Sequence, residues 1–226
     1  MAARGVRIEL SYDERTAVPL RAGRGEAEAA DAVDRFVEAS GADRDWARDL
    51  VRAGDELTAA GTVALLLVEP GPRVAGILAL SAVDAPVDID DLADFLTSED
   101  PSRLPVAMAL HAPGLGPGVT TAVRHGGSAT ASRRWVFPGD GCLVFGKCLA
   151  FDPAHLGILD PLAHAAIAGA TVAGFRPADD ALAVVEDLVA AFQPEGEEWP
   201  EDLSSGAVGG DGGAPLDELK RQLGTH

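Results

Sequence analysis

The chain has 226 residues, enough for one domain of ordinary size with appendages, and its 47% hydrophobic residues suffice for a buried core. It contains 18 Lys and Arg and 36 Asp and Glu, which gives a formal net charge of −18. This balance argues against nucleic-acid partners and against anionic membranes, because both attract basic surfaces. The excess of acidic residues can be explained without a specific function, either because it keeps the protein soluble or because the host is adapted to salt.

The N-terminal segment contains no apolar stretch of the kind that forms a secretory signal, and the longest apolar run, Thr62 to Val68, is too short to span a bilayer. We therefore expect a cytoplasmic protein. Cys142 and Cys148 lie in one predicted strand, roughly 20 Å apart, which is beyond disulfide reach. We expect both thiols to be free and structural, with neither a metal site nor a cofactor.

Two helices are predicted near the N-terminus. Apolar residues at helical spacing favour a helix from Glu26 to Ala39, which Ser40-Gly41 ends. Asp43 is a suitable N-cap for a second helix, which runs to Gly61. The helices form a short antiparallel pair that cannot bury both apolar faces alone, so it docks on the rest of the chain.

The central part of the chain is predicted to be a sheet of local hairpins. Two nearly continuous apolar runs flank Pro70-Gly71-Pro72, which indicates a hairpin whose strands are covered on both faces. A second hairpin turns at Gly126-Gly127-Ser128, and a third spans Arg133 to Phe151. In the third, Pro138 and Gly139 suit positions i+1 and i+2 of a type II turn, so we expect a positive φ at Gly139.

Helices are predicted around this sheet. Val87 to Thr97 suggests a short helix with an acidic first turn, whereas Leu104 to His111 is either a strand or a helical stub. After the last hairpin, an Ala-rich helix ends at Pro177, and a further helix covers Asp179 to Phe192. Small residues in the Ala-rich helix permit close approach to a sheet: Ala165, Ala166, Ala168 and Gly169.

Together these elements predict an α+β fold, with an antiparallel sheet of about six strands flanked by helices. Leu216, Leu219 and Leu223 lie at the spacing of a small terminal amphipathic helix, which either folds back on its own domain or binds a partner. The expected divisions are an arm over 1–25, whose start is either an edge strand or an extended segment, a single domain over 26–193 (helical pair 26–60, sheet 62–151, helices 152–193) and a flexible, acidic, Gly-rich tail over 194–226.

No motif for metal or phosphate binding is complete. The acidic segment from Asp84 to Glu99 fails as a calcium loop, because Leu92 and Ala93 occupy positions that require a ligand and a glycine. Gly114 to Gly118 matches neither glycine-rich phosphate motif, although its glycine content makes it a candidate loop for covering a ligand.

The candidate site residues are five basic or titratable side chains. Arg124, Arg133 and Arg134 form the one basic cluster, and we expect them at a sheet edge, where they bind an anion or acidic partner or simply lie in solvent. His111 and His125 flank Gly114 to Gly118 and are the candidates for a catalytic site at that loop.

The stretch Trp135 to Phe145, WVFPGDGCLVF, is followed by Asp160-Pro161-Leu162 and by an apolar helix containing Ile167-Ala168. This order resembles the last strands and helix of the Mog1/PsbP-like family, specifically its actinobacterial LpqN-type members. The resemblance covers roughly Thr62 to Val172. It implies an antiparallel sheet flanked by helices and a non-enzymatic binding or accessory role, without catalytic residues.

Three functional hypotheses follow. The first is a non-catalytic binding or accessory protein that acts through protein–protein contacts. The second is a small hydrolase or transferase with a site near Gly114 to Gly118. The third is an immunity or regulatory protein whose acidic face neutralises a basic partner.

Overall fold

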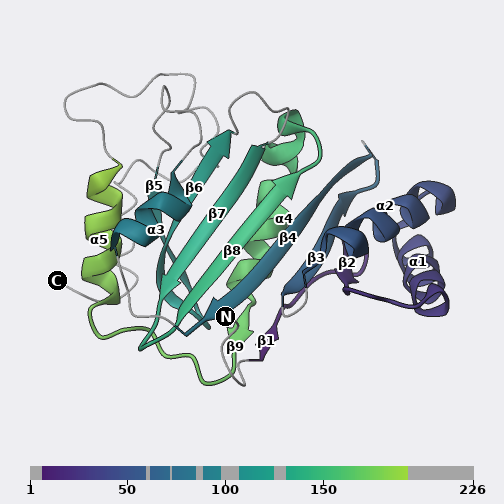
Figure 1. The fold of residues 1–226 in the computed structure, drawn as a ribbon. Helices are drawn as coiled ribbons and strands as arrows, with labels where there is room; N and C mark the ends of the chain where they lie inside the picture. The colour runs from purple at the N-terminus through teal and green to yellow at the C-terminus, as the bar shows by residue number, and fades with distance from the viewer. Residues whose placement is uncertain are drawn as a thin grey trace.

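The computed structural model describes residues 7–59, 62–71, 73–84, 89–97, 107–124 and 131–192. They form a seven-stranded antiparallel sheet with helices on both faces and a separate two-stranded sheet (Figure 1), which confirms the predicted α+β class. The large sheet has the strand order β2-β3-β4-β8-β7-β6-β5. The elements are β1 (Ile8–Glu9), β2 (Ala17–Leu20), α1 (Glu26–Ser40), α2 (Arg44–Leu57), β3 (Val63–Glu69), β4 (Val74–Val83), α3 (Ile89–Leu96), β5 (Ala107–Ala112), β6 (Gly116–Arg124), β7 (Ala131–Pro138), β8 (Leu143–Ala150), the 3-10 turn η1 (Pro153–His155), α4 (Leu156–Ala168), β9 (Thr171–Val172) and α5 (Ala181–Ala191).

The N-terminal helical pair is present as predicted. Gly41, with φ 70°, ends α1, and the Asp43 side chain caps α2 by accepting a hydrogen bond from the backbone N–H of Trp46 at 2.9 Å. The pair packs on the β2–β4 end of the sheet through a shared apolar cluster that includes Val33, Phe36, Ala47, Val51, Leu66 and Ile77.

The predicted hairpins also form. Strands β3 and β4, β6 and β7, and β7 and β8 pair antiparallel, in registers that place Leu66 opposite Ile77 and Thr120 opposite Trp135. The stretch Leu104 to His111, predicted to be either a strand or a helical stub, contains most of a strand, β5, which pairs with β6. Local hairpin connections account for most of the sheet, which is why turn signals in the sequence located it.

The last hairpin turns two residues later than predicted. The positive φ belongs to Gly141 (68°), not to Gly139, which still pairs with Cys142 through a 2.9 Å hydrogen bond from its N–H to the Cys142 carbonyl. Gly139 is required for a different reason. A Cβ there would lie 2.7 Å from the Cys142 carbonyl oxygen and would collide with the Phe175 ring. The chain after α4 packs against this turn: the Asp140 N–H donates to the Arg176 carbonyl at 2.9 Å, and the Ala178 N–H donates to the Pro138 carbonyl at 3.2 Å.

The arm and the chain after α4 contain strands that the sequence patterns missed. Strand β2, within the predicted arm, is the seventh strand of the large sheet, and β1 pairs with β9 in the small one. Four residues that include Pro19 carry too weak an alternation to signal a strand. Helix α4 ends at Ala168 rather than near Pro177, because the chain then enters β9.

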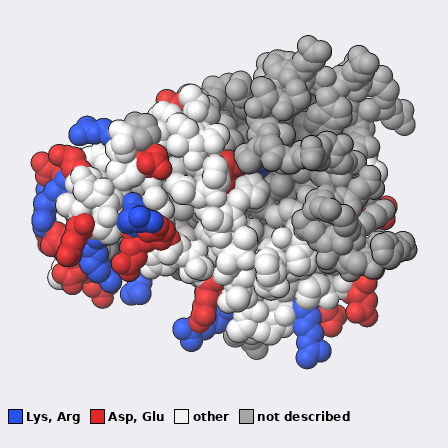
Figure 2. Space-filling view, turned by 180° about the vertical axis from the view of Figure 1, so that it is seen from behind, with Lys and Arg blue, Asp and Glu red and all other residues white. Residues whose placement is uncertain are grey.

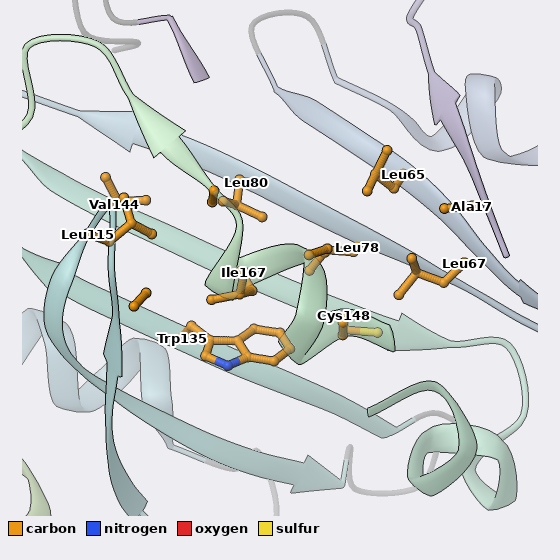
Figure 3. Close-up of a cluster of buried hydrophobic side chains, with 14 of the residues drawn as sticks. Ala17, Leu65, Leu67, Leu78, Leu80, Leu115, Trp135, Val144, Cys148 and Ile167 are labelled. Carbon is orange, nitrogen blue, oxygen red and sulfur yellow. The ribbon is translucent and has the colours of Figure 1, made fainter. Parts of the chain in front are cut away.

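The strands of the large sheet divide their side chains between two helical layers. Trp135 and Phe137 of β7 point toward α4, where Trp135 lies next to Ile167, while Val144 lies beside Leu115 (Figure 3). Val136, between them in sequence, points to the opposite face and packs with α3 and α5. The alternation is the two-residue period of a strand. Helix α4 therefore covers one face, while α1 and α2 at one end and α3 and α5 at the other cover the opposite face.

Candidate functional site

The predicted arginine patch at a sheet edge does not form from Arg133 and Arg134. Both lie on β7, an inner strand between β6 and β8. As neighbours on one strand they point to opposite faces. Arg124 ends β6 opposite Ala131, and His125 lies outside the described residues. The prediction of an edge patch is therefore wrong for Arg133 and Arg134, because the strand order, set by pairing between distant segments, places β7 inside the sheet.

Arg134 anchors helix α3 to the sheet. Its side chain is almost fully buried, and its guanidinium donates to the carbonyls of Phe95 and Thr97, the latter at 3.1 Å. Thr121, beside it on β6, donates its hydroxyl to the Leu96 carbonyl at 3.0 Å. These donors satisfy carbonyls at the C-terminus of a helix, where a cation also complements the dipole. The role of Arg134 is therefore structural.

Arg133, on the other face, belongs to a titratable cluster centred on Asp160 of α4. Its guanidinium holds the Asp160 carboxylate of α4 with two hydrogen bonds, one of them 2.9 Å from Nε to Oδ1. His164, one turn along α4, places Nδ1 3.4 Å from Asp160 Oδ1, and its ring stands edge-on to Trp135 with centroids 5.4 Å apart. Arg133 and Asp160 are largely buried, with side-chain exposures of 13% and 21%.

The Arg133–Asp160–His164 cluster favours the ionised form of the Asp160 carboxyl. Burial alone would raise the pKa of Asp160, but hydrogen bonds from His164 and Arg133, and the attraction of both charges, lower it to about 2. The nearby thiol of Cys148 is buried, and desolvation together with the Asp160 charge raises its pKa to about 12. A thiol with that pKa is not a nucleophile at neutral pH. The cluster therefore fastens α4 to β7 without supplying an activated nucleophile.

The two cysteines are free, as predicted. Cys148 is buried within β8, and Cys142 is half-buried just before that strand. Burial raises the pKa of the Cys142 thiol as well, so it remains protonated at neutral pH.

The loop from Gly114 to Gly118 is part of the core rather than a mobile cover. Leu115 is fully buried, and a Cβ at Gly114 would collide with the Ala170 carbonyl. Gly116, with φ 75°, makes the tight turn into β6. His111 lies half-buried on the edge strand β5, opposite Pro117. Five residues along β6, or roughly 17 Å, separate that position from the one opposite Arg133, so His111 and Arg133 do not converge.

A hollow of about 330 Å³ opens between β2 and α1, with both charge signs in its lining. Arg24, which is buried at this site, pairs with Asp55 of α2 at 3.1 Å and donates to the Pro19 carbonyl. The outer edge of β2 is closed to another strand, because Ala17 donates to Asp13 and Pro19 has no N–H. These contacts hold the corner between β2 and the helical pair together.

The outer surface of α4 is distinctive because it carries no charge. Its solvent-exposed positions are Gly157, Ile158, Pro161, Ala165 and Ala168, here called the α4 outer face. At 3.6 residues per turn they occupy an arc of about 100° on one side of the helix. Ile158 is 42% exposed. The one charged residue of α4, Asp160, is turned toward Arg133 and does not belong to this face.

The outer surface of helix α2 looks different. The exposed positions of α2 are all charged except Leu57. Seen from the α4 side, charged side chains gather over the α1–α2 end, while the middle of the face is largely uncharged (Figure 2). The sequence reasoning assigned Ala165, Ala168 and Gly169 to close approach to the sheet, but the structure exposes all three and buries Ala166. The sequence feature that could have revealed this uncharged face is the presence of a single charged residue among the thirteen of α4.

Several predictions concern segments outside the described residues, including Leu216, Leu219 and Leu223. Within the described part of the chain, no group of three or more His, Cys, Asp or Glu side chains is placed to hold a metal ion. None of the described helices combines the length and apolar character required to cross a bilayer.

Comparison of the chain with protein-family models, curated proteins and solved structures finds no match.

Proposed function

We propose that this chain is a non-catalytic binding or accessory protein that acts through protein–protein contacts at the α4 outer face. The observation that carries the proposal is an exposed, uncharged helix face on a chain with a net charge of −18. Contiguous apolar surface on a folded protein is a feature of interaction sites, because leaving it in water costs free energy. The resemblance to Mog1/PsbP-like proteins points to the same class of function.

The titratable side chains also support binding over catalysis. Asp160 binds both Arg133 and His164, and the adjacent Cys148 thiol is protonated and buried. The hydrolase or transferase alternative gains no support from the described residues, because the Gly114–Gly118 loop is packed into the core and His111 lies away from Arg133.

The test compares Ile158→Asp with a matched control, Leu57→Asp, which places the same charge on an exposed apolar position of α2. Each purified variant is used to capture proteins from an extract of the source cells, with chemical cross-linking and mass spectrometry as readout. We expect wild type and Leu57→Asp to capture the same proteins and Ile158→Asp to lose them at least tenfold, roughly 1.4 kcal/mol. Equal capture by all three, or capture by none, would contradict the proposal.

A further inference from the structure

We infer that the hollow between β2 and α1 binds a small zwitterion, a molecule that carries an ammonium group and a carboxylate group on an apolar body. This inference goes beyond the proposed function, because no residue of α4 lines the hollow. Three features carry it: the volume and floor of the hollow, the charges around its rim, and the way in which those charges are left unpaired.

The hollow has the size and the floor of a small-molecule site. Its volume is about 330 Å³, at the lower end of the range of about 300–1,000 Å³ that is typical of ligand pockets. Ala17 and Val18 of β2 line it together with Ala32 and Phe36 of α1, and all four side chains are buried. An apolar group placed on this floor would leave water without displacing a charge.

Charged side chains of both signs surround this floor. Glu28, Asp31 and Arg35 all turn toward the hollow, since residues three, four and seven apart lie on one face of a helix. Glu14, which precedes β2, and Arg21, which follows it, complete the rim. All five residues are exposed to solvent, at the end of the molecule where Figure 2 shows charges of both signs.

These rim charges are not paired with one another. Asp31 and Arg35 have an i, i+4 spacing, at which Arg52 and Glu56 of α2 pair at 3.4 Å, yet the structure has no ion pair between them. Among the described residues, the side chains of Arg21 and Arg35 have no ion-pair or hydrogen-bond partner. Most other guanidinium groups in this part of the chain bind a carboxylate. Charges of both signs are therefore available to a ligand.

Arg24 fixes the shape of the hollow from below the rim. Its side chain is only 4% exposed, and its Nε lies 3.1 Å from a carboxylate oxygen of Asp55. The Nε–H is not aligned for a hydrogen bond to that oxygen, so a buried donor of the lining is left without an acceptor. The guanidinium also donates to the Pro19 carbonyl. The site is thus held in place before a ligand binds, which lowers the entropy lost on binding.

The arrangement of charge favours a zwitterion over an ion of one sign. A purely anionic ligand would be repelled by the net charge of −18 and by the carboxylates of the rim. A purely cationic ligand would lie against the unpaired guanidinium groups of Arg21 and Arg35. A zwitterion avoids both costs, because its carboxylate binds guanidinium groups while its ammonium group binds the acidic side chains.

Three probes that differ only in charge test the inference. Glycyl-phenylalanine is a zwitterion, its N-acetyl derivative keeps only the carboxylate, and its amide keeps only the ammonium group. Isothermal titration calorimetry with the full-length protein measures the affinities, and NMR shifts of backbone amides locate the site. We expect the zwitterion to bind at least tenfold more tightly than either derivative, with the shifts concentrated in Ala17–Leu20 and Glu26–Ser40.

Two substitutions on the rim should change the preference in opposite ways. Arg35→Gln should weaken binding of the zwitterion at least fivefold and leave the amide unaffected, because only the zwitterion has a carboxylate to lose its partner. Asp31→Asn should weaken binding of the zwitterion and the amide but not of the N-acetyl derivative. The control Arg52→Gln removes a charge from α2 outside the hollow and should bind as wild type does. Circular dichroism checks that each variant is folded.

Several outcomes would overturn the inference. They are no binding of any probe up to about 10 mM, equal affinity for all three, tighter binding of a singly charged derivative, and amide shifts confined to residues outside the hollow. The capture experiment is independent of this one. Ile158→Asp should bind glycyl-phenylalanine as wild type does, so failure at the hollow leaves the proposed function standing, and failure of capture leaves the zwitterion site standing.

Discussion

Arg133 and Arg134 are adjacent basic residues with unrelated roles. One guanidinium holds a carboxylate of α4, and the other holds carbonyls at the end of α3. Both side chains are largely buried, where removing one member of a charged pair costs more than the pair itself contributes. At this scale the basic cluster joins two helices to opposite faces of one strand.

The Arg133–Asp160–His164 cluster makes stability depend on pH. The folded-state pKa of Asp160, about 2, lies below its ordinary value of 3.8. The carboxylate therefore stabilises the fold above about pH 4, and this contribution disappears as the pH falls toward 2. We expect wild type to exceed Asp160→Asn by about 2 kcal/mol in unfolding free energy at pH 6, and the difference to shrink between pH 4 and 2. Urea unfolding at each pH measures it; a constant difference would contradict the assignment.

Gly139 and Gly141 are needed for different reasons, which substitutions can separate. Asn tolerates the left-handed backbone, so Gly141→Asn should cost little, whereas Gly141→Val should cost about 1–2 kcal/mol. At Gly139 any Cβ collides with its neighbours, so Asn and Val should both destabilise, by about 1–3 kcal/mol. Thermal or urea unfolding of the four variants checks this. A well-tolerated Gly139→Asn would show that the contact with Phe175 is not a constraint.

At the scale of elements, α3 depends on side chains from the sheet. The helix has eight residues, too few to be stable alone, and its last carbonyls accept from Arg134 and Thr121. Arg134→Leu should therefore loosen α3 while leaving α1 and α2 unchanged. Arg134→Lys should rescue it only in part, because one ammonium cannot reproduce the planar fork.

Hydrogen exchange followed by mass spectrometry measures this effect. Amides of Ile89–Leu96 should exchange at least tenfold faster in Arg134→Leu, and those of Glu26–Ser40 at the wild-type rate. Uniform acceleration across both helices would show a global loss of stability instead of local release of α3.

At the scale of the whole molecule, the acidic net charge and the uncharged α4 outer face respond differently to salt when a partner binds. Salt screens the attraction between oppositely charged partners, whereas apolar contact is not weakened by it. Raising NaCl from 50 to 500 mM should therefore leave the capture of partner proteins through the α4 outer face unchanged or stronger, as measured by cross-linking and mass spectrometry. An electrostatic complex with a basic partner, the immunity or regulatory alternative, would weaken over the same range. Capture that weakens with salt would contradict contact through the α4 outer face.

The site was less predictable than the hairpins because side chains on separate elements meet only after folding. The sequence singled out Arg133 but gave no reason to join it to Asp160, 27 positions away on a helix. It identified the small residues of α4 but not the side on which they lie. The helix has apolar residues around most of its circumference, so periodicity alone does not separate its buried side from its exposed side.

Local physics in the sequence determined the helical pair, the hairpins and the antiparallel class, because caps, glycines and apolar periods act between near neighbours. Asp43 and Gly41 are examples, and each does in the structure what its chemistry requires. Tertiary structure alone decided that β2 completes the sheet, that β7 is an inner strand, and that Ala165 faces outward beside Ile158. Those outcomes depend on which distant segments pair and which face each buries, and no short stretch of the chain contains that information.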